Sequence, residues 1–345
     1  MNLKRFIAPA LVAALFATAA PGGAQTFKVE KWQIGGTGGH DYITAEPGDT
    51  HVFVSRGTSV LIVDGMNGKV VDSIPYTLRV HGIAVAPRES HGFTSNAGDS
   101  TVTWFELGSH RIINTIKIDA GGLDGITYDE TAHQVILTNH SNPGTVVALN
   151  AQTGEFSGTF VLDDRAPEGA VADGKGRLYV NLEGKNVVQV LDAGLVKGIA
   201  QWPVAPCDGP TGIEYDHKGA RLFVGCSKNS IVFDVKTGKI VATIPNGDGV
   251  DGIAFDQEQK LLYIPAGRSG NVTVVKQETP DKYTVVATVQ TMPGTKTITI
   301  DPKTHRVYTV ALERGPAPAA PANAQPGARP PQAPVIGAYF FAITH

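Results

Sequence analysis

Residues 250–266, VDGIAFDQEQKLLYIPA, contain two short β-rich segments separated by a polar turn. The same order of small, branched and aromatic residues recurs in VHGIAVAPRESHGFTSN from Val80, LDGITYDETAHQVILTN from Leu123 and TGIEYDHKGARLFVGC from Thr211. Alignment on one glycine of each copy gives units spaced 40 to 44 residues apart, anchored at Gly82, Gly125, Gly169, Gly212 and Gly252. Tyr42 and Thr297 extend the series at its two ends, which makes seven units. A period of this length is typical of four-stranded β-propeller blades.

Each unit repeats one order of strands and turns, shown here for the fifth and sixth units. The first strand is built from small and branched residues (252–255), and the second is branched and aromatic (222–224). The third ends in aspartate (231–234), a Thr-Gly-Lys hairpin signal follows at 237–239, and the fourth strand closes the unit. We therefore predict an all-β fold, a seven-bladed β-propeller with four-stranded antiparallel blades.

The two ends of the chain predict how the ring closes. Residues 27–34 form one strand before the first unit, and the last unit has only three strands, at 296–300, 306–312 and 335–343. We expect the N-terminal strand to join the last blade as its fourth strand, because closure removes exposed sheet edges.

A Pro/Ala-rich insertion, residues 315–334, lies inside the last unit. Its composition predicts an extended loop that forms no ladder. It is either a tolerated insertion or a flap that docks a partner, and we expect it on the face where the first strands begin.

The N-terminus predicts export. Lys4 and Arg5 precede an apolar, alanine-rich run, and Gly22 and Ala24 are small residues suited to signal peptidase. We interpret residues 1–24 as a signal peptide and 25–345 as one propeller domain, periplasmic or secreted, without a membrane span.

Two cysteines, Cys207 and Cys226, are compatible with this location. An even count in an exported protein favours a disulfide, and the repeat places both at one end of one hairpin. Two buried free thiols are the alternative.

Composition and motifs narrow the function classes. The formal net charge of −3 does not predict a duplex nucleic-acid partner. The sequence has no C-x-x-C-H, H-E-x-x-H, G-x-S-x-G or phosphate-loop motif. No catalytic residue is assigned, and a non-enzymatic role is favoured.

Polar residues that vary from unit to unit define the candidate site. The starts of first strands and the ends of second strands meet at one end of a propeller, around the mouth of the central channel. The predicted ligand-binding residues are Asp41, Arg56, His81, Asn96, Asp124, His140, Glu168, Asn181, Asp251, Arg268 and Lys296.

Three interpretations of this ring compete. It binds a polypeptide, a nucleic-acid strand or a small ligand; or it is structural, with acidic residues capping strand amides and turns. In the third interpretation, a divalent metal is held for lactonase-like hydrolysis, with candidate ligands Asp41, His81, Asp124, Glu168 and Asp251.

The second-strand endings VILTN (135–139), GFTSN (92–96) and LYVN (178–181) resemble the YVTN repeat. Together with the Thr-Gly-Lys hairpins they make the mature chain similar to bacterial YncE-like β-propellers. Gly225-Cys226 and Pro265-Ala266 depart from the usual polar ending. The resemblance implies an exported seven-bladed propeller, usually without an established enzymatic activity. Relatives include single-stranded-DNA-binding and surface-layer proteins, and more distant propellers bind haem or hydrolyse lactones; none of their sites transfers residue by residue.

We therefore expect a monomeric binding or scaffolding module that holds a protein or a small ligand at the channel mouth. A metal-dependent hydrolase of the lactonase type is the alternative, with a divalent metal as its cofactor. An accessory role in a periplasmic redox pathway is the third hypothesis.

Overall fold

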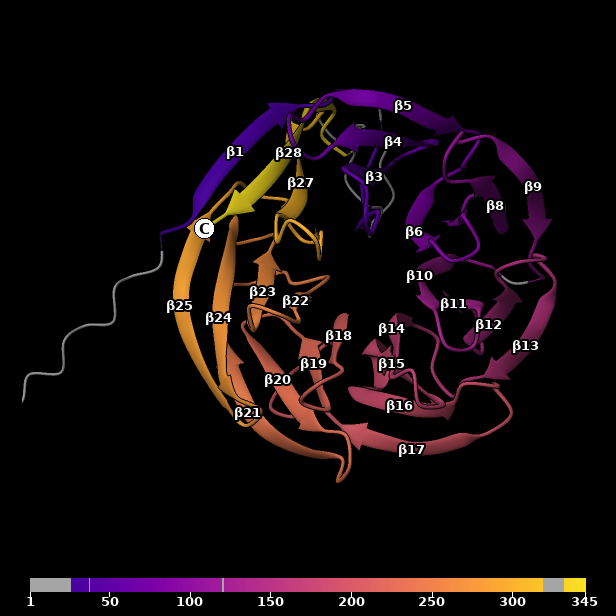
Figure 1. The fold of residues 1–345 in the computed structure, drawn as a ribbon, viewed down its shortest axis with the longest axis vertical. Coiled ribbons are helices and arrows are strands. Elements are labelled where there is room, and N and C mark those ends of the chain that lie inside the picture. Colours follow the sequence, from indigo (N-terminus) through magenta and orange to yellow (C-terminus); the bar gives the residue numbers. More distant parts are fainter. Residues whose placement is uncertain (1–25, 37, 120, 319–331) are drawn as a thin grey trace, which may run out of the picture.

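The computed structural model describes residues 26–36, 38–119, 121–318 and 332–345. They form seven four-stranded antiparallel sheets arranged in a ring (Figure 1). Within this part of the chain the one helical element is a short 3-10 helix, η1 (Glu183–Lys185). The predicted seven-bladed β-propeller is confirmed.

The blades follow the chain in order, and each runs from the channel outward. Blade 1 contains β2 (Ile43–Ala45), β3 (His51–Arg56), β4 (Ser59–Asp64) and β5 (Val70–Pro75). Blade 2 contains β6 (Val80–Ala86), β7 (His91–Asn96), β8 (Thr101–Glu106) and β9 (Ile112–Lys117). Blade 3 contains β10 (Leu123–Asp129), β11 (Gln134–Asn139), β12 (Thr145–Asn150) and β13 (Phe156–Val161). Blade 4 contains β14 (Pro167–Ala172), β15 (Arg177–Leu182), β16 (Val187–Asp192) and β17 (Gly198–Pro203).

The remaining blades keep the same order. Blade 5 contains β18 (Gly212–Asp216), β19 (Arg221–Gly225), β20 (Asn229–Asp234) and β21 (Lys239–Pro245). Blade 6 contains β22 (Ala254–Asp256), β23 (Leu261–Ala266), β24 (Asn271–Thr279) and β25 (Lys282–Gln290). Blade 7 contains β26 (Ile298–Ile300), β27 (Val307–Arg314), β28 (Val335–Thr344) and β1 (Lys28–Gln33).

The N-terminal strand closes the ring, as the sequence predicted. Blade 7 has the strand order β1-β28-β27-β26, and β1 pairs antiparallel with β28 from Lys28↔Thr344 to Gln33↔Tyr339. The N-terminal strand thus completes blade 7, and the chain continues from it into blade 1, which ties the two ends of the ring together (Figure 1).

The core lies between blades. Seven clusters of buried apolar side chains fill the seven interfaces between neighbouring blades. Phe223 of blade 5 packs on Phe255 of blade 6 with ring centroids 4.7 Å apart, for example. Because both faces of a blade are covered, its inner strands are apolar along their length rather than alternating.

Three hairpin glycines are explained by tryptophans from the preceding blade. Trp32 covers Gly68, Trp104 covers Gly154 and Trp202 covers Gly238. Gly238 has a φ of +66°, and a Cβ there would lie 2.6 Å from Trp202 Nε1. The hairpin therefore needs glycine both for its backbone conformation and for the indole that lies against it.

Cys207 and Cys226 form the predicted disulfide, with Cα atoms 5.7 Å apart. It joins the loop before β18 to the end of β19 and packs in the core between blades 4 and 5. Closing this loop of 19 residues contributes about 3 kcal/mol to stability.

Two predictions fall wholly or partly outside the described residues. The signal peptide, residues 1–24, lies outside them, as does most of the Pro/Ala-rich insertion. The described ends of the insertion meet at the tip of the β27–β28 hairpin, where the Gly315 N–H donates to the Pro334 carbonyl at 2.9 Å. No helix among the described residues is long and apolar enough to cross a membrane.

Candidate functional site

The channel mouth is assembled from one residue of every blade. Backbone bonds join the starts of neighbouring first strands: Tyr42 N donates to His81 O, Gly169 N to Thr211 O, and Asp251 N to Lys296 O. The seven aligned positions therefore lie around one rim, and they carry Asp41, His81, Asp124, Glu168, Thr211, Asp251 and Lys296.

Six of these side chains, with His140 from the loop after β11, form one chain of ion pairs, which we call the rim network. His81 Nδ1 lies 2.8 Å from Asp41 Oδ2 and 3.0 Å from Asp124 Oδ1. His140 Nε2 lies 3.1 Å from the other Asp124 oxygen and 3.3 Å from Glu168 Oε1.

Lys296 extends the rim network at its other end. Its Nζ lies 2.8 Å from Asp41 Oδ1 and also contacts Asp251. Acidic and basic groups therefore alternate from Glu168 to Asp251. Four carboxyl groups face three basic groups, so the rim network is close to neutral.

The pKa shifts in the rim network follow from burial and these contacts. Burial opposes protonation of His81, but the bonds to Asp124 and Asp41 outweigh it and raise its pKa to about 9. Burial also disfavours the Asp41 carboxylate, yet His81 and Lys296 hold its pKa down at about 2. His81 and Asp41 are therefore both charged at neutral pH.

The carboxyl groups at the two ends of the rim network, Glu168 and Asp251, have raised pKa values instead. Burial raises the pKa of Glu168 to about 7, against the opposing bond from His140. The bond to Glu168 in turn raises the pKa of His140. Burial raises the pKa of Asp251, which Lys296 opposes. Glu168 is thus the rim carboxyl that takes up a proton near neutral pH.

Three predicted site residues are instead buried in the frame. The guanidinium of Arg56 donates to the carbonyls of Gly35, Gly36, Gly38 and Gly39, and holds the loop between β1 and β2. Asn96 donates to the hydroxyls of Thr101 and Thr103 within blade 2. Asn181 donates to two carbonyls of blade 5. We therefore leave these three side chains out of the proposed site.

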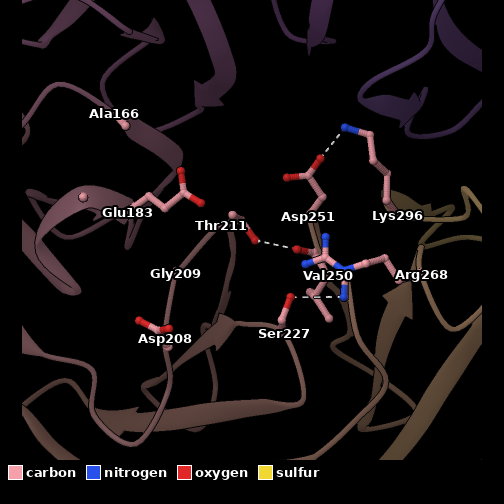
Figure 2. Close-up of a pocket in the computed structure, with 12 residues that line it drawn as sticks. Ala166, Glu183, Asp208, Gly209, Thr211, Ser227, Val250, Asp251, Arg268 and Lys296 are labelled. Atoms are coloured by element: carbon pink, nitrogen blue, oxygen red, sulfur yellow. Dashed lines mark hydrogen bonds and ion pairs between the residues drawn. The ribbon is translucent and has the colours of Figure 1, made fainter. Parts of the chain in front are cut away.

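A pocket of about 640 Å³ opens beside the rim network, over blades 4 to 7, and we call it the mouth pocket. Glu183 and Asp208 lie on one wall, and Arg268 and Lys296 lie on the other (Figure 2). Arg268 is 70% exposed at its side chain and pairs with Asp248 at 3.1 Å. Acidic side chains thus occupy one wall, whereas the opposite wall carries the two cations together with Asp251, which contacts Lys296.

Two groups within the rim network have ligand atoms close enough to hold a metal ion. They are Asp41–His81–Asp124 and Asp124–His140–Glu168, and in each the ligand atoms lie within 4.8 Å of one another. Four of the five predicted metal ligands are included, and His140 is added. Asp251 instead contacts Lys296. Imidazole and carboxylate donors suit Zn²⁺ or Mn²⁺.

Sequence reasoning did not single out two residues of the mouth pocket, Asp208 and Ser227. Both lie in connections outside the aligned first strands, where the repeat carries no signal. Their positions alone could have placed them on the face of the channel mouth, because Ser227 follows the end of β19 and Asp208 precedes the start of β18.

Comparisons with known proteins support the fold. The sequence matches no described family, and no curated protein resembles it significantly. Solved structures with the same architecture include hydrazine synthase of Kuenenia stuttgartiensis, with 18% identity and a TM-score of 0.70, covering 80% of this chain and 93% of that one. The WD40 repeats of RRP9 align with 10% identity and a TM-score of 0.74, covering 92% and 97%.

A chain of the mitotic checkpoint complex aligns with 14% identity and a TM-score of 0.73, covering 89% of this chain and 96% of that one. Similarities at these identities concern architecture and carry no site from one protein to another. Together with the seven blades and the closing strand, they establish this chain as a seven-bladed β-propeller.

Proposed function

We propose that this chain is an exported YVTN-type propeller that acts as a binding module and holds a polar ligand in the mouth pocket. The observation that carries the proposal is the gathering of charged side chains around that pocket, with both cations on one side of it. Glu183 and Asp208 lie opposite Arg268 and Lys296 (Figure 2). Blade packing uses the apolar strands and does not require the side chains of Glu183, Asp208 and Arg268.

The charge pattern indicates the class of ligand. A small molecule or chain segment with both a cationic and an anionic group would satisfy the two walls at once. Lys296 is already oriented by Asp41 and Asp251, so little side-chain freedom is lost when it binds an anionic group. The exposed Arg268 can reach the same group from the rim.

The binding test compares the substitution of an arginine in the mouth pocket with the substitution of an arginine far from it. We expect native mass spectrometry of protein purified without refolding to show a bound species, and Arg268→Ala to bind the same species about 10-fold more weakly, since a charge-assisted bond is lost. Arg111→Ala, at an exposed arginine on an outer hairpin, should bind as wild type does. A wild-type protein without a bound species, or equal binding by Arg268→Ala, would contradict the proposal.

A metal-dependent hydrolase of the lactonase type is the second candidate, favoured by the two groups that share Asp124. Asp41, His81, Asp124, His140 and Glu168 would hold the metal. A divalent cation there would supply Lewis-acid polarisation of a substrate carbonyl. Lys296 competes with this role, because it already neutralises Asp41.

Elemental analysis tests the second candidate. Asp124→Asn weakens both groups at once, so we expect metal content to fall from about one ion per chain to a trace, because a carboxylate ligand is lost. The matched control is Asp49→Asn, in the separate group Glu46–Asp49–His51 on the opposite face. Wild-type protein without metal after growth with Zn²⁺ and Mn²⁺ would rule this candidate out.

A further inference from the structure

The central channel continues below the rim. A cavity of about 160 Å³ shares Thr211 and Asp251 with the mouth pocket, and it shares Thr127, Ala170 and Ile213 with a larger cavity. The larger cavity has a volume of about 860 Å³ and reaches the turns between first and second strands, on the face opposite the rim. We call it the lower vestibule. The three cavities therefore lie end to end along the channel.

Glu214 is the residue of the lower vestibule that the repeat does not explain. It pairs with Phe223 in the register of blade 5. The residues that occupy the same register position in the other six blades are small and uncharged: Thr44, Ala84, Thr127, Val171, Ala254 and Thr299. Six blades thus form without a carboxyl at this register position, so blade packing does not explain Glu214.

The Glu214 carboxyl has no charged partner among the described residues. One oxygen accepts a hydrogen bond from the Tyr215 backbone N–H at 2.9 Å. Burial raises the pKa of Glu214 to about 7, and this backbone bond opposes the shift only in part. A cation that enters the vestibule would therefore supply the partner that the carboxylate lacks.

Other titratable groups of the lower vestibule are engaged elsewhere or lie at its rim. Asp129 and Asp173 accept backbone bonds within their own turns. The Tyr128 hydroxyl donates to Glu89 at 2.6 Å. The residues exposed at the opening of the lower vestibule are Arg88, Glu130, Lys175 and His217.

We propose that the lower vestibule is a second binding site, for a small organic ammonium ion with an apolar body, and that Glu214 is its counter-ion. The apolar body would lie against Val85, Ala170 and Ile213, which line the same cavity as Glu214. The volume is in the range of small-molecule sites, which combine apolar walls with a few placed polar groups. This site lies at the other end of the channel and does not depend on the mouth pocket.

Benzylammonium is the probe, with benzyl alcohol and benzoate as neutral and anionic analogues of similar shape. We expect isothermal titration calorimetry to show saturable binding of benzylammonium to the wild type. Binding to Glu214→Gln should be about 10-fold weaker or more, because a charge-assisted hydrogen bond is lost. The affinity of benzyl alcohol for the wild type should be lower than that of benzylammonium by a similar factor.

Two matched variants place the effect. Glu130→Gln removes an exposed carboxyl from the opening of the lower vestibule. This variant should bind benzylammonium as wild type does. Arg268→Ala should also leave this affinity unchanged, which separates the second site from the mouth pocket. A thermal melt of Glu214→Gln at or above the wild-type midpoint confirms that the variant is folded.

Three results of the binding experiments with the wild type and Glu214→Gln would overturn the second site. They are no saturable binding of benzylammonium to the wild type, equal affinity for benzyl alcohol, and unchanged affinity in Glu214→Gln. Equal weakening by Glu130→Gln would also overturn it, because general attraction at the rim would then explain the binding.

Discussion

Replacing Lys296 with methionine is expected to lower the free energy of unfolding by about 2 kcal/mol near neutral pH. Methionine keeps much of the side-chain volume but removes the cation that lies between Asp41 and Asp251. Removing one partner of a buried pair costs about 3–5 kcal/mol, and we reduce that figure because the Lys296 side chain is 32% exposed.

The loss in Lys296→Met should depend on pH. Without the lysine, burial raises the pKa of Asp251 further, so its ionisation destabilises the fold as pH rises through that value. The difference from wild type should therefore be larger at about pH 8 than at about pH 4. Denaturant titrations at both pH values measure it.

Lys218→Met is the matched control for this experiment, because Lys218 is exposed in a turn on the opposite face. Its free energy of unfolding should stay within about 0.5 kcal/mol of wild type. If Lys296→Met were equally harmless, the rim network would not contribute to stability, and its side chains would be free for a ligand.

Replacing Glu214 with threonine is expected to stabilise the protein at alkaline pH by up to about 3 kcal/mol. Threonine already occupies this register position in three other blades, as Thr44, Thr127 and Thr299. Burial raises the pKa of Glu214 from 4.5 to about 7 in the folded chain. The folded state therefore binds the proton more tightly than the unfolded state does.

The sign of this effect follows from linkage. A carboxyl whose pKa is higher in the folded state than in the unfolded state makes the protein less stable as pH rises from the unfolded-state pKa through the folded-state pKa. Wild type and Glu214→Thr should therefore differ little at about pH 4 and diverge up to about pH 8. Glu130→Thr, at an exposed carboxyl, should show no such divergence. A parallel pH profile for wild type and Glu214→Thr would contradict the unpaired, half-buried state of Glu214.

The fold was largely predictable because the blade is repeated seven times and its strands pair with neighbours that are close in sequence. Each unit makes its own hairpins, so turn residues such as Gly238 and the aromatic second strands recur at a fixed spacing. Closure by β1 was predictable because the last unit lacked one strand and residues 27–34 formed a strand that belonged to no unit.

The candidate site was only partly predictable. Aligned strand starts identified rim residues such as His81 and Asp124, because their place follows from the repeat. The same reasoning included Arg56 and Asn181, whose side chains turn into the frame and satisfy buried carbonyls. Strand position sets where a Cα lies but not which partner a long polar side chain finds.

Glu214 shows what a closer comparison of the units could have detected. Its position in the first strand is small and uncharged in every other blade, and this difference is visible in the sequence alone. Its chemical meaning was not visible, because the enclosure of Glu214 and its lack of a cationic partner depend on how blades 1 to 5 surround the channel.

The sequence by itself determined the number of blades, the strand order within each blade and the closing strand, since these follow from local patterns and a repeat period. The tertiary structure alone decided the order of charges around the rim and the opposite walls of the mouth pocket. Residues 250–266 illustrate both: Ile253, Phe255 and Tyr263 build the frame wherever the repeat occurs. Asp251 acquires its partner only when blades 6 and 7 pack together and bring Lys296 beside it, because electrostatic contacts depend on distance in space rather than along the chain.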